Sequence, residues 1–356
     1  MRARYTMSRD AAVEAAVARQ MADLGAALHA AHPEASVVLL GSLGAGEAVV
    51  ARGAQGLRWL SDVEVALVQP TPIPPRALAR ARAAAREAVP GADVGVWWTS
   101  PLRVRLGRAT GLTRNLWDLR HASRVLAGPD RVAPLPRWAP SELPAWEGYR
   151  LLFNRMAEHL AAPPAPDALA RAYRDAKLRT GAMDAVLLAK GRYELGLGRR
   201  LASFEALGGP RELLPERPGA FAEAIAFRAD PRPASRAGVG GRAAEGALCM
   251  LAGARAPAEA LERMARPAYW RGLWRPPLLG RAVARAQHRQ AEGTRRALRT
   301  LVRGLPPEVA AYWLVAASFV ARRGDGDAEA VLEQRAKLPA PRARAVALDA
   351  WRRVCY

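Results

Sequence analysis

A pair of carboxylates follows a glycine–serine turn in the first third of the chain. Val38-Leu39-Leu40-Gly41-Ser42 predicts a strand that runs into a tight turn, and Asp62 and Glu64 open a second predicted strand. Because side chains alternate between the two faces of a strand, Asp62 and Glu64 point the same way. Two like charges on one face are costly unless something neutralises them, and a hard divalent cation does this best.

The turn before these acids adds a feature that suits a phosphate. Backbone N–H groups in a glycine turn such as Gly41-Ser42 can hold an anion. A phosphate-binding turn beside a metal-binding pair of acids predicts metal-assisted chemistry on a nucleoside triphosphate. The sequence contains no Gly-x-Ser-x-Gly motif, dinucleotide fingerprint or suitably spaced histidines that would compete for the catalytic role.

The order of these elements resembles the nucleotidyltransferase fold of the DNA polymerase β superfamily. A hydrophobic strand ends in Gly41-Ser42, and Ser61-Asp62-Val63-Glu64 is similar to the Ser-Asp-x-Asp/Glu of the following strand in that family. Within the superfamily, the chain is most similar to the minimal and aminoglycoside-type nucleotidyltransferases. The resemblance covers residues 10–130 well and residues 146–207 loosely.

The resemblance implies both a site and a reaction. Gly41 and Ser42 would bind the triphosphate, and Asp62 and Glu64 would hold two Mg2+ ions. A third carboxylate on a later strand completes the site in that family, and Asp93 is the candidate here, as a metal ligand and as a general base. The implied enzyme transfers a nucleoside monophosphate, AMP from ATP, to a hydroxyl of a small-molecule acceptor and releases pyrophosphate.

A lysine in the later helical region is a further candidate for nucleotide binding. Lys177 follows Tyr173 by four residues on one predicted helix face, and a lysine over the triphosphate would fit the family. An ordinary exposed helix face explains the same spacing equally well. Asp93 also has a plain alternative role, since a carboxylate after Pro90-Gly91 can be a turn residue.

Two departures from the family pattern keep other functions open. The gap from Ser42 to Asp62 is longer than usual, which predicts an insertion around residues 51–59. Glu64 stands where aspartate is commoner, and it carries its charge one methylene further out. One alternative is an enzyme that adds AMP to a protein acceptor. The other is a non-catalytic protein that binds nucleotide in the same fold.

Composition places the chain among soluble globular proteins. It has 356 residues, 51% of them hydrophobic and 24% charged. The formal net charge of +21 comes from dispersed arginines, with only three lysines and no basic run, so we expect no specific nucleic-acid partner. An anionic nucleotide suits some of this charge, and solvated helix faces account for most of it.

The cysteines and the apolar segments bear on location. Cys249 and Cys355 lie far apart with no histidine nearby, which predicts neither a disulfide framework nor a zinc site and fits a reducing cytoplasm. Asp10 and Glu14 interrupt any apolar run near the start, so no signal peptide is expected. The most apolar stretch, residues 309–321, is too short to span a bilayer and predicts a buried helix, so no membrane partner is expected.

Hydrophobic periodicity predicts an α+β protein. A nucleotidyltransferase domain with a small mixed sheet covers residues 1–131, and a helical domain over residues 145–208 would cover the nucleotide and the acceptor. A further helical domain without a predicted role spans residues 242–356. The proline-rich residues 132–144 form the predicted linker.

Within the first domain, an amphipathic helix is expected before Pro33. The predicted strands are Ser36–Leu40, Asp62–Val68 and Ala92–Trp98, and the other predicted helices are Gly41 to about Val50, Arg76–Val89 and Leu116–Leu126, with a loop over residues 52–59. The later helices are predicted at Trp146–Ala161, Asp167–Gly191, Gly198–Leu207, Ala243–Leu251, Pro257–Met264, Leu279–Val302, Pro307–Arg322 and Ala328–Lys337. Exposed breaks are predicted at residues 208–219 and 230–241.

Overall fold

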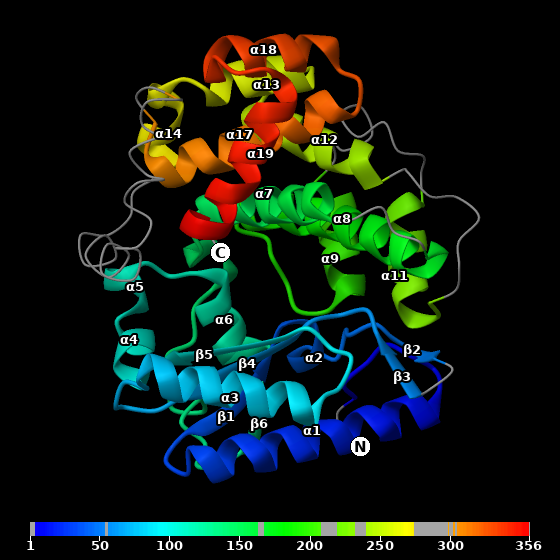
Figure 1. Ribbon diagram of the computed structural model, residues 1–356, viewed down its shortest axis with the longest axis vertical. Coiled ribbons are helices and arrows are strands. Elements are labelled where there is room, and N and C mark those ends of the chain that lie inside the picture. The colour runs from blue at the N-terminus through cyan, green and yellow to red at the C-terminus, as the bar shows by residue number, and fades with distance from the viewer. Residues whose placement is uncertain are drawn as a thin grey trace. The chain divides into compact units, whose positions relative to one another are not determined.

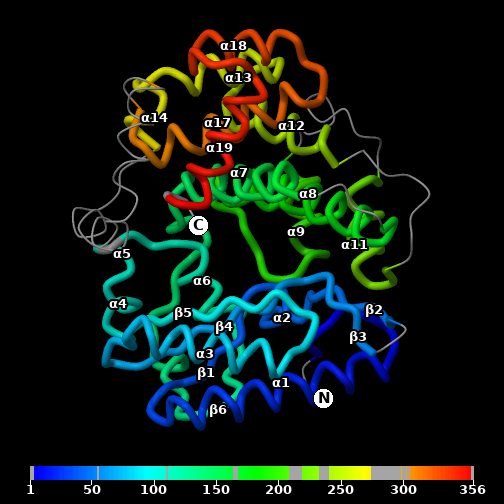
Figure 2. The backbone as a smooth tube through the Cα atoms, viewed as in Figure 1, coloured from blue at the N-terminus to red at the C-terminus, as the bar shows by residue number. Residues whose placement is uncertain are grey.

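The chain divides into two compact units. The computed structural model describes residues 4–53, 56–162, 167–207, 219–231, 240–273, 298, 302 and 305–355. The first unit comprises Met1–Leu143, Glu194–Arg199 and Ile225–Pro233, and the second comprises Pro144–Tyr193, Arg200–Ala224 and Ala234–Tyr356. Figure 1 labels the elements of both units, and Figure 2 follows the path of the chain through them.

The first unit is built on a four-stranded mixed sheet with the strand order β5-β4-β1-β6. The strand β1 (Ser36–Leu40) pairs antiparallel with β4 (Val63–Val68) and with β6 (Arg124–Ala127). The strand β5 (Val94–Thr99) runs parallel to β4 and forms one edge of the sheet. This small mixed sheet, together with the helices of both units, confirms the predicted α+β class.

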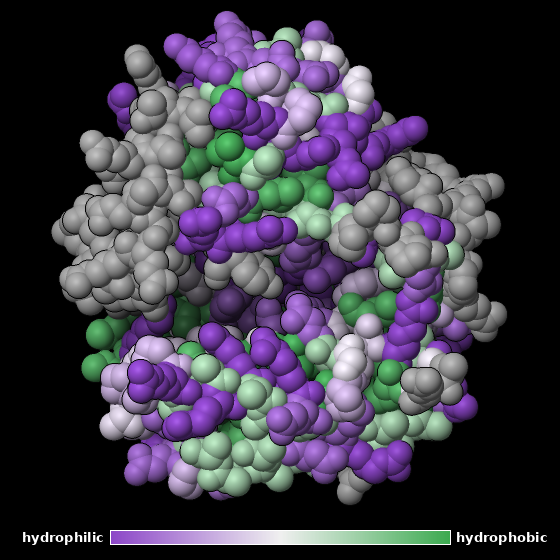
Figure 3. Space-filling view, viewed as in Figure 1, coloured by the Kyte–Doolittle hydropathy of each residue, from purple (hydrophilic) through white to green (hydrophobic). Residues whose placement is uncertain are grey.

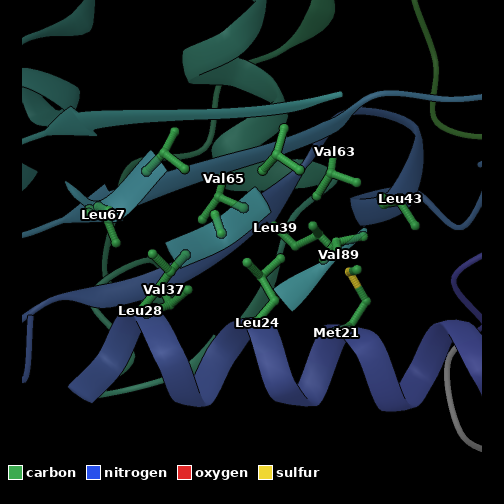
Figure 4. Close-up of a cluster of buried hydrophobic side chains, with 14 of the residues drawn as sticks. Met21, Leu24, Leu28, Val37, Leu39, Leu43, Val63, Val65, Leu67 and Val89 are labelled. Carbon is green, nitrogen blue, oxygen red and sulfur yellow. The ribbon is translucent and has the colours of Figure 1, made fainter. Parts of the chain in front are cut away.

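Two long helices pack on one face of this sheet. Apolar side chains of α1 (Ala11–Ala31) and α3 (Pro75–Ala88) meet those of β1, β4 and β5 in the core of the unit. Val63, Val65 and Leu67 alternate along β4 and all lie in this core (Figure 4). Since successive side chains of a strand point to opposite faces, Glu64 belongs to the other face.

Shorter helices precede and follow the strands of the first unit. The helix α2 (Gly41–Gly44) follows β1, and α6 (Arg114–His121) packs on β1. The helices α4 (Pro101–Arg105) and α5 (Gly107–Thr110) follow β5. Most of the predicted linker also belongs to this unit, which runs without interruption to Leu143 and buries Leu135 and Trp138.

The helix after β1 is shorter than predicted. It ends at Gly44 rather than near Val50, and Gly46 has a positive φ of 77°, which ends helical geometry. A Cβ at Gly46 would lie 2.7 Å from the carbonyl oxygen of Arg4, so a side chain does not fit there.

The prediction of a loop at residues 52–59 is wrong. The strands β2 (Val50–Gly53) and β3 (Gly56–Trp59) form an antiparallel hairpin, in which Val50 lies opposite Trp59. A β-branched residue opposite an aromatic residue is a favourable cross-strand pair, and the paired backbone groups satisfy one another.

The helix predicted over Leu116–Leu126 is wrong in its second half. The helix α6 ends at His121, and β6 follows. Pairing with β1 lays Leu126 against α1, where a Cβ on Gly25 would come within 3.0 Å of the Leu126 Cβ. Strand pairing and burial, which depend on distant residues, outweigh the local helix preference.

The second unit is helical throughout its described residues. The helices α7 (Trp146–Ala161) and α8 (Ala168–Ala189) pack so closely that a Cβ on Gly148 would overlap the carbonyl oxygen of Ala185. The helices that the structure describes after residue 189 are α9 (Leu197–Glu205), α11 (Ala220–Ala229), α12 (Gly240–Ala252), α13 (Pro257–Met264), α14 (Pro267–Leu273), α17 (Pro307–Arg322), α18 (Gly326–Ala336) and α19 (Ala340–Ala350), followed by a π-helical turn at Trp351–Cys355. The helices α9 and α11 contribute residues to both units.

The apolar helix predicted near residue 309 is confirmed. In α17, every residue from Val309 to Val320 is buried, and the helix packs against α7, α18 and α19. None of the helices in the described part of the chain combines the length and apolar character that a membrane crossing needs. The predicted helix at 279–302 and the predicted breaks at 208–219 and 230–241 fall largely outside the described residues.

Candidate active site

The turn after β1 and the start of β4, which carries Glu64 and directly follows Asp62, meet at one end of the sheet. In the antiparallel pairing of these strands, Leu40 lies opposite Glu64. The next residue after Leu40 is Gly41, so the turn begins beside the Glu64 carboxylate. The register therefore brings together residues that are more than twenty positions apart in the sequence.

Gly41 and Glu64 are in close approach. Gly41 has a positive φ of 60°, and a Cβ placed there would lie 2.9 Å from Oε2 of Glu64. Glycine therefore serves two purposes, because it adopts the left-handed conformation and makes room for the carboxylate. Asp62 and Glu64 are both half-buried and lie on either side of the buried Val63.

A buried serine fixes the start of β4. Ser61 is 2% exposed, and its Oγ accepts a hydrogen bond from the backbone N–H of Val49 at 2.9 Å. The Ser61 N–H in turn donates to the carbonyl oxygen of Val49 at 3.1 Å. These bonds tie the residue before Asp62 to the segment that enters the hairpin, and so position the first carboxylate.

The Ser42 side chain carries a buried and unpartnered hydroxyl. Its Oγ has no hydrogen-bond partner among the described residues, whereas its carbonyl oxygen accepts from the N–H of Glu47 at 2.6 Å. A buried polar atom without a partner is costly. A ligand oxygen at the turn would satisfy this hydroxyl.

An arginine that the sequence analysis did not single out binds the loop between α2 and β2, which follows the glycine–serine turn. Arg228, on α11, is 7% exposed and donates from Nη2 to the carbonyl oxygen of Glu47 at 2.8 Å. Both residues belong to the first unit, although 181 positions separate them. Only the tertiary structure reveals this contact, since one arginine among many carries no sequence signal.

Asp93 lies directly before β5, next to the start of β4. Its carbonyl oxygen accepts from the N–H of Val63 at 2.8 Å, and its side chain is exposed. In the described part of the chain, no three His, Cys, Asp or Glu side chains are close enough together to hold a metal ion. The structure thus places the Asp93 backbone beside Val63, the residue between the two acids, without a three-carboxylate cluster among the described residues.

Lys177 lies on α8 in the second unit. Its Nζ is 3.3 Å from Oε2 of Glu158 in an ion pair, and its side chain is 20% exposed. Tyr173, one turn earlier, is buried. Glu158 is thus one partner of the lysine, and Lys177 belongs to the second unit, whereas Gly41, Glu64 and Asp93 belong to the first.

The structure adds two residues of β5 to the same face of the sheet. In the parallel pairing with β4, Gly95 lies opposite Glu64 and Trp97 lies opposite Ala66. Gly95 is exposed and Trp97 is half-buried. The sequence offered one signal for this part of the site, a glycine between two valines of a predicted strand. A glycine within a strand often marks a position where a ligand or another backbone segment comes close.

Comparison with known proteins returns no relatives for this chain. No protein-family model matches it, and no curated protein or solved structure is significantly similar to it.

Proposed function

We propose that the protein is a metal-dependent nucleotidyltransferase of the DNA polymerase β type. It would move AMP from ATP to a hydroxyl of a small-molecule acceptor and release pyrophosphate. The observation that carries the proposal is the pairing of Leu40 with Glu64, which sets the glycine–serine turn against the second of the two acids. The order of the elements supports it further. The strand β1 leads into the turn, β4 pairs antiparallel with β1, and β5 pairs parallel with β4.

The paired acids suit Mg2+. Mg2+ prefers carboxylate oxygens and is usually bound through one or two carboxylates together with substrate phosphates and water. Glu64 lies next to a turn suited to phosphate, and Asp62, two residues earlier in the sequence and directly before β4, would supply the second carboxylate. When bound, the metal would offset the charge of the triphosphate and lower the pKa of a coordinated hydroxyl.

The remaining residues would position the reactants. The turn at Gly41 and the unpartnered hydroxyl of Ser42 would hold the two phosphates that leave. The acceptor oxygen bonds to the α-phosphorus while the bond from that phosphorus to its bridging oxygen breaks, and pyrophosphate departs with the bridging oxygen. The hydroxyl proton passes to a base, for which the exposed carboxylate of Asp93 is our candidate.

Charge-removing variants test the metal assignment. Asp62→Asn and Glu64→Gln should leave thermal unfolding unchanged but weaken binding of Mg2+ with α,β-methylene-ATP by about tenfold or more, measured by calorimetry. Pyrophosphate release from ATP should fall by about 100-fold, because several kcal/mol of charge stabilisation are lost. Asp23→Asn, which removes an exposed carboxylate from α1, is the matched control and should behave like wild type.

The outcomes separate the competing functions. Unchanged, Mg2+-dependent nucleotide affinity in both variants contradicts the metal assignment. Nucleotide binding without pyrophosphate release, whatever the acceptor, indicates a non-catalytic binding protein. Radiolabelled AMP that becomes attached to protein rather than to a small molecule indicates a protein-modifying enzyme.

A further inference from the structure

The edge strand beside the acids carries two residues that the proposed chemistry does not yet use. Gly95 and Trp97 are in register with Glu64 and Ala66 of β4. Residues in register on neighbouring strands share a face, so Gly95 and Trp97 lie on the face of the Glu64 carboxylate. Trp98 alternates to the other face, where it packs on the core and donates from Nε1 to the carbonyl oxygen of Gln69.

Gly95 leaves an open space next to Glu64. It is exposed, and no described atom lies within 4 Å of the position that a Cβ would take there. Its backbone is not in the positive-φ region, so chain geometry does not require glycine at this position. Because glycine weakens a strand, its presence without a steric or backbone reason suggests that a ligand approaches here.

Trp97 gives the same face an aromatic surface. Its side chain is half-buried and lies two residues beyond Gly95 on the strand. A tryptophan ring offers a wide, rigid face on which planar or cyclic groups stack, and its indole N–H is a hydrogen-bond donor.

The strand order shows which reactant this face would receive. The turn that would hold the leaving phosphates follows β1, Glu64 lies on β4 with Asp62 directly before that strand, and Gly95 lies on β5, in the spatial order β1-β4-β5. In an in-line displacement, the attacking and leaving oxygens lie on opposite sides of the phosphorus. If the leaving phosphates lie at β1 and the reacting phosphorus at β4, the attacking hydroxyl arrives from β5.

We propose that Gly95 and Trp97 form the acceptor subsite, and that the acceptor is a small ring compound bearing hydroxyl groups. The ring stacks on Trp97, and the attacking hydroxyl lies in the space over Gly95. This inference rests on the proposed nucleotidyl transfer and assigns its acceptor side.

Two variants and one control test the subsite. Gly95→Val fills the open space with a residue that favours strands, so its unfolding temperature should equal or exceed that of wild type. Trp97→Ala removes the stacking surface. Trp98→Phe changes the neighbouring tryptophan, which faces the core, and is the matched control.

The assay compares ring and open-chain acceptors in the full-length protein. Pyrophosphate release from MgATP is measured with myo-inositol, methyl glucoside or glycerol at equal hydroxyl concentration, and α,β-methylene-ATP binding is measured in parallel. We expect ring compounds to stimulate release in wild type more than glycerol does. Trp97→Ala should raise the half-maximal ring concentration about tenfold, Gly95→Val should abolish the stimulation, and both should keep wild-type nucleotide affinity.

The results distinguish failure of the subsite from failure of the nucleotidyltransferase assignment. The subsite is overturned if wild type binds the analogue but ring compounds stimulate no more than glycerol, or if Gly95→Val and Trp97→Ala respond as Trp98→Phe does. A wild type that binds no nucleotide in the presence of Mg2+ overturns the nucleotidyltransferase assignment and the subsite with it.

Discussion

The contact between Gly41 and Glu64 links backbone conformation to the chemistry of the site. Gly41 has a positive φ, and a Cβ placed on it would lie 2.9 Å from the Glu64 carboxylate. The first feature affects stability, because side chains are unfavourable in the left-handed region. The second affects the site, because any side chain at Gly41 must displace the end of Glu64.

Gly41→Ala should separate these two effects. We expect the free energy of unfolding to fall by about 1–2 kcal/mol, the cost of a left-handed alanine. Nucleotide affinity should fall about tenfold or more, because Glu64 can no longer take its position beside the turn. Denaturant unfolding and calorimetric titration with α,β-methylene-ATP measure the two quantities.

Gly91→Ala is the control for that variant. Gly91 also has a positive φ, of 81°, but no described atom lies within 4 Å of its Cβ position. It should lose a similar amount of stability and keep wild-type nucleotide affinity. An equal loss of affinity in both variants would show that the contact with Glu64 does not matter for nucleotide binding.

At the scale of elements, hydrogen bonds of His121 and Trp117 join α6 to the residues after β6. The ring of His121 stacks on Trp117 at 4.5 Å, and its Nε2 accepts from the N–H of Trp138 at 3.2 Å. Trp117 Nε1 donates to the carbonyl oxygen of Trp138 at 2.9 Å. Burial, followed by the nearby charges of Arg120 and Arg137, lowers the pKa of His121 below its usual 6.5.

Stability should therefore depend on pH through this histidine. The folded protein keeps His121 neutral, whereas the unfolded chain takes up the proton near pH 6.5, so the stabilisation is present above that pH and is lost as the pH falls below it. Protonation would also remove the acceptor for Trp138. Between pH 7.5 and 5.5, we expect the unfolding temperature of wild type to fall more than that of His121→Gln.

Comparing the two proteins isolates this one titration. Burial also lowers the pKa values of His32 and His159, but both histidines remain in wild type and variant alike. The same decline in both proteins over this pH range would show that His121 makes no contribution.

At the scale of the whole molecule, the positive charge is spread out. The chain carries a formal charge of +21, and hydrophilic side chains are scattered over the visible face of the first unit rather than gathered in one patch (Figure 3). Dispersed charge supports association with polyanions without selecting a sequence. Many of the arginines also have carboxylate partners, such as Arg200 with Asp184 and Arg323 with Glu245.

Binding to RNA should consequently be weak and sensitive to salt. We expect association with a homopolymeric RNA at 50 mM salt to weaken by about 100-fold or more at 200 mM, because counterion release dominates such binding. Fluorescence anisotropy at several salt concentrations measures this. Submicromolar binding that persists at 200 mM would instead favour a nucleic acid as the acceptor.

Local sequence patterns were sufficient for much of the helical structure. Hydrophobic periodicity predicted α7, α13 and α17 with the bounds that the structure has. Those signals lie within the helix itself, so no distant residue is needed to detect them. The hairpin at residues 50–59 and the strand β6 were mispredicted, because their pairing partners supply the energy that decides between strand and loop or helix.

The candidate site divides in the same way. The period of a strand predicted that Asp62 and Glu64 share a face, and glycine followed by serine predicted a turn. In the structure β4 begins at Val63, so Asp62 lies directly before the strand. Only the tertiary structure decided that this turn lies against Glu64, that Arg228 holds its loop, and that Gly95 and Trp97 share the face of the acids. Strand register and contacts between distant residues depend on the packing of the whole unit, which no local pattern encodes.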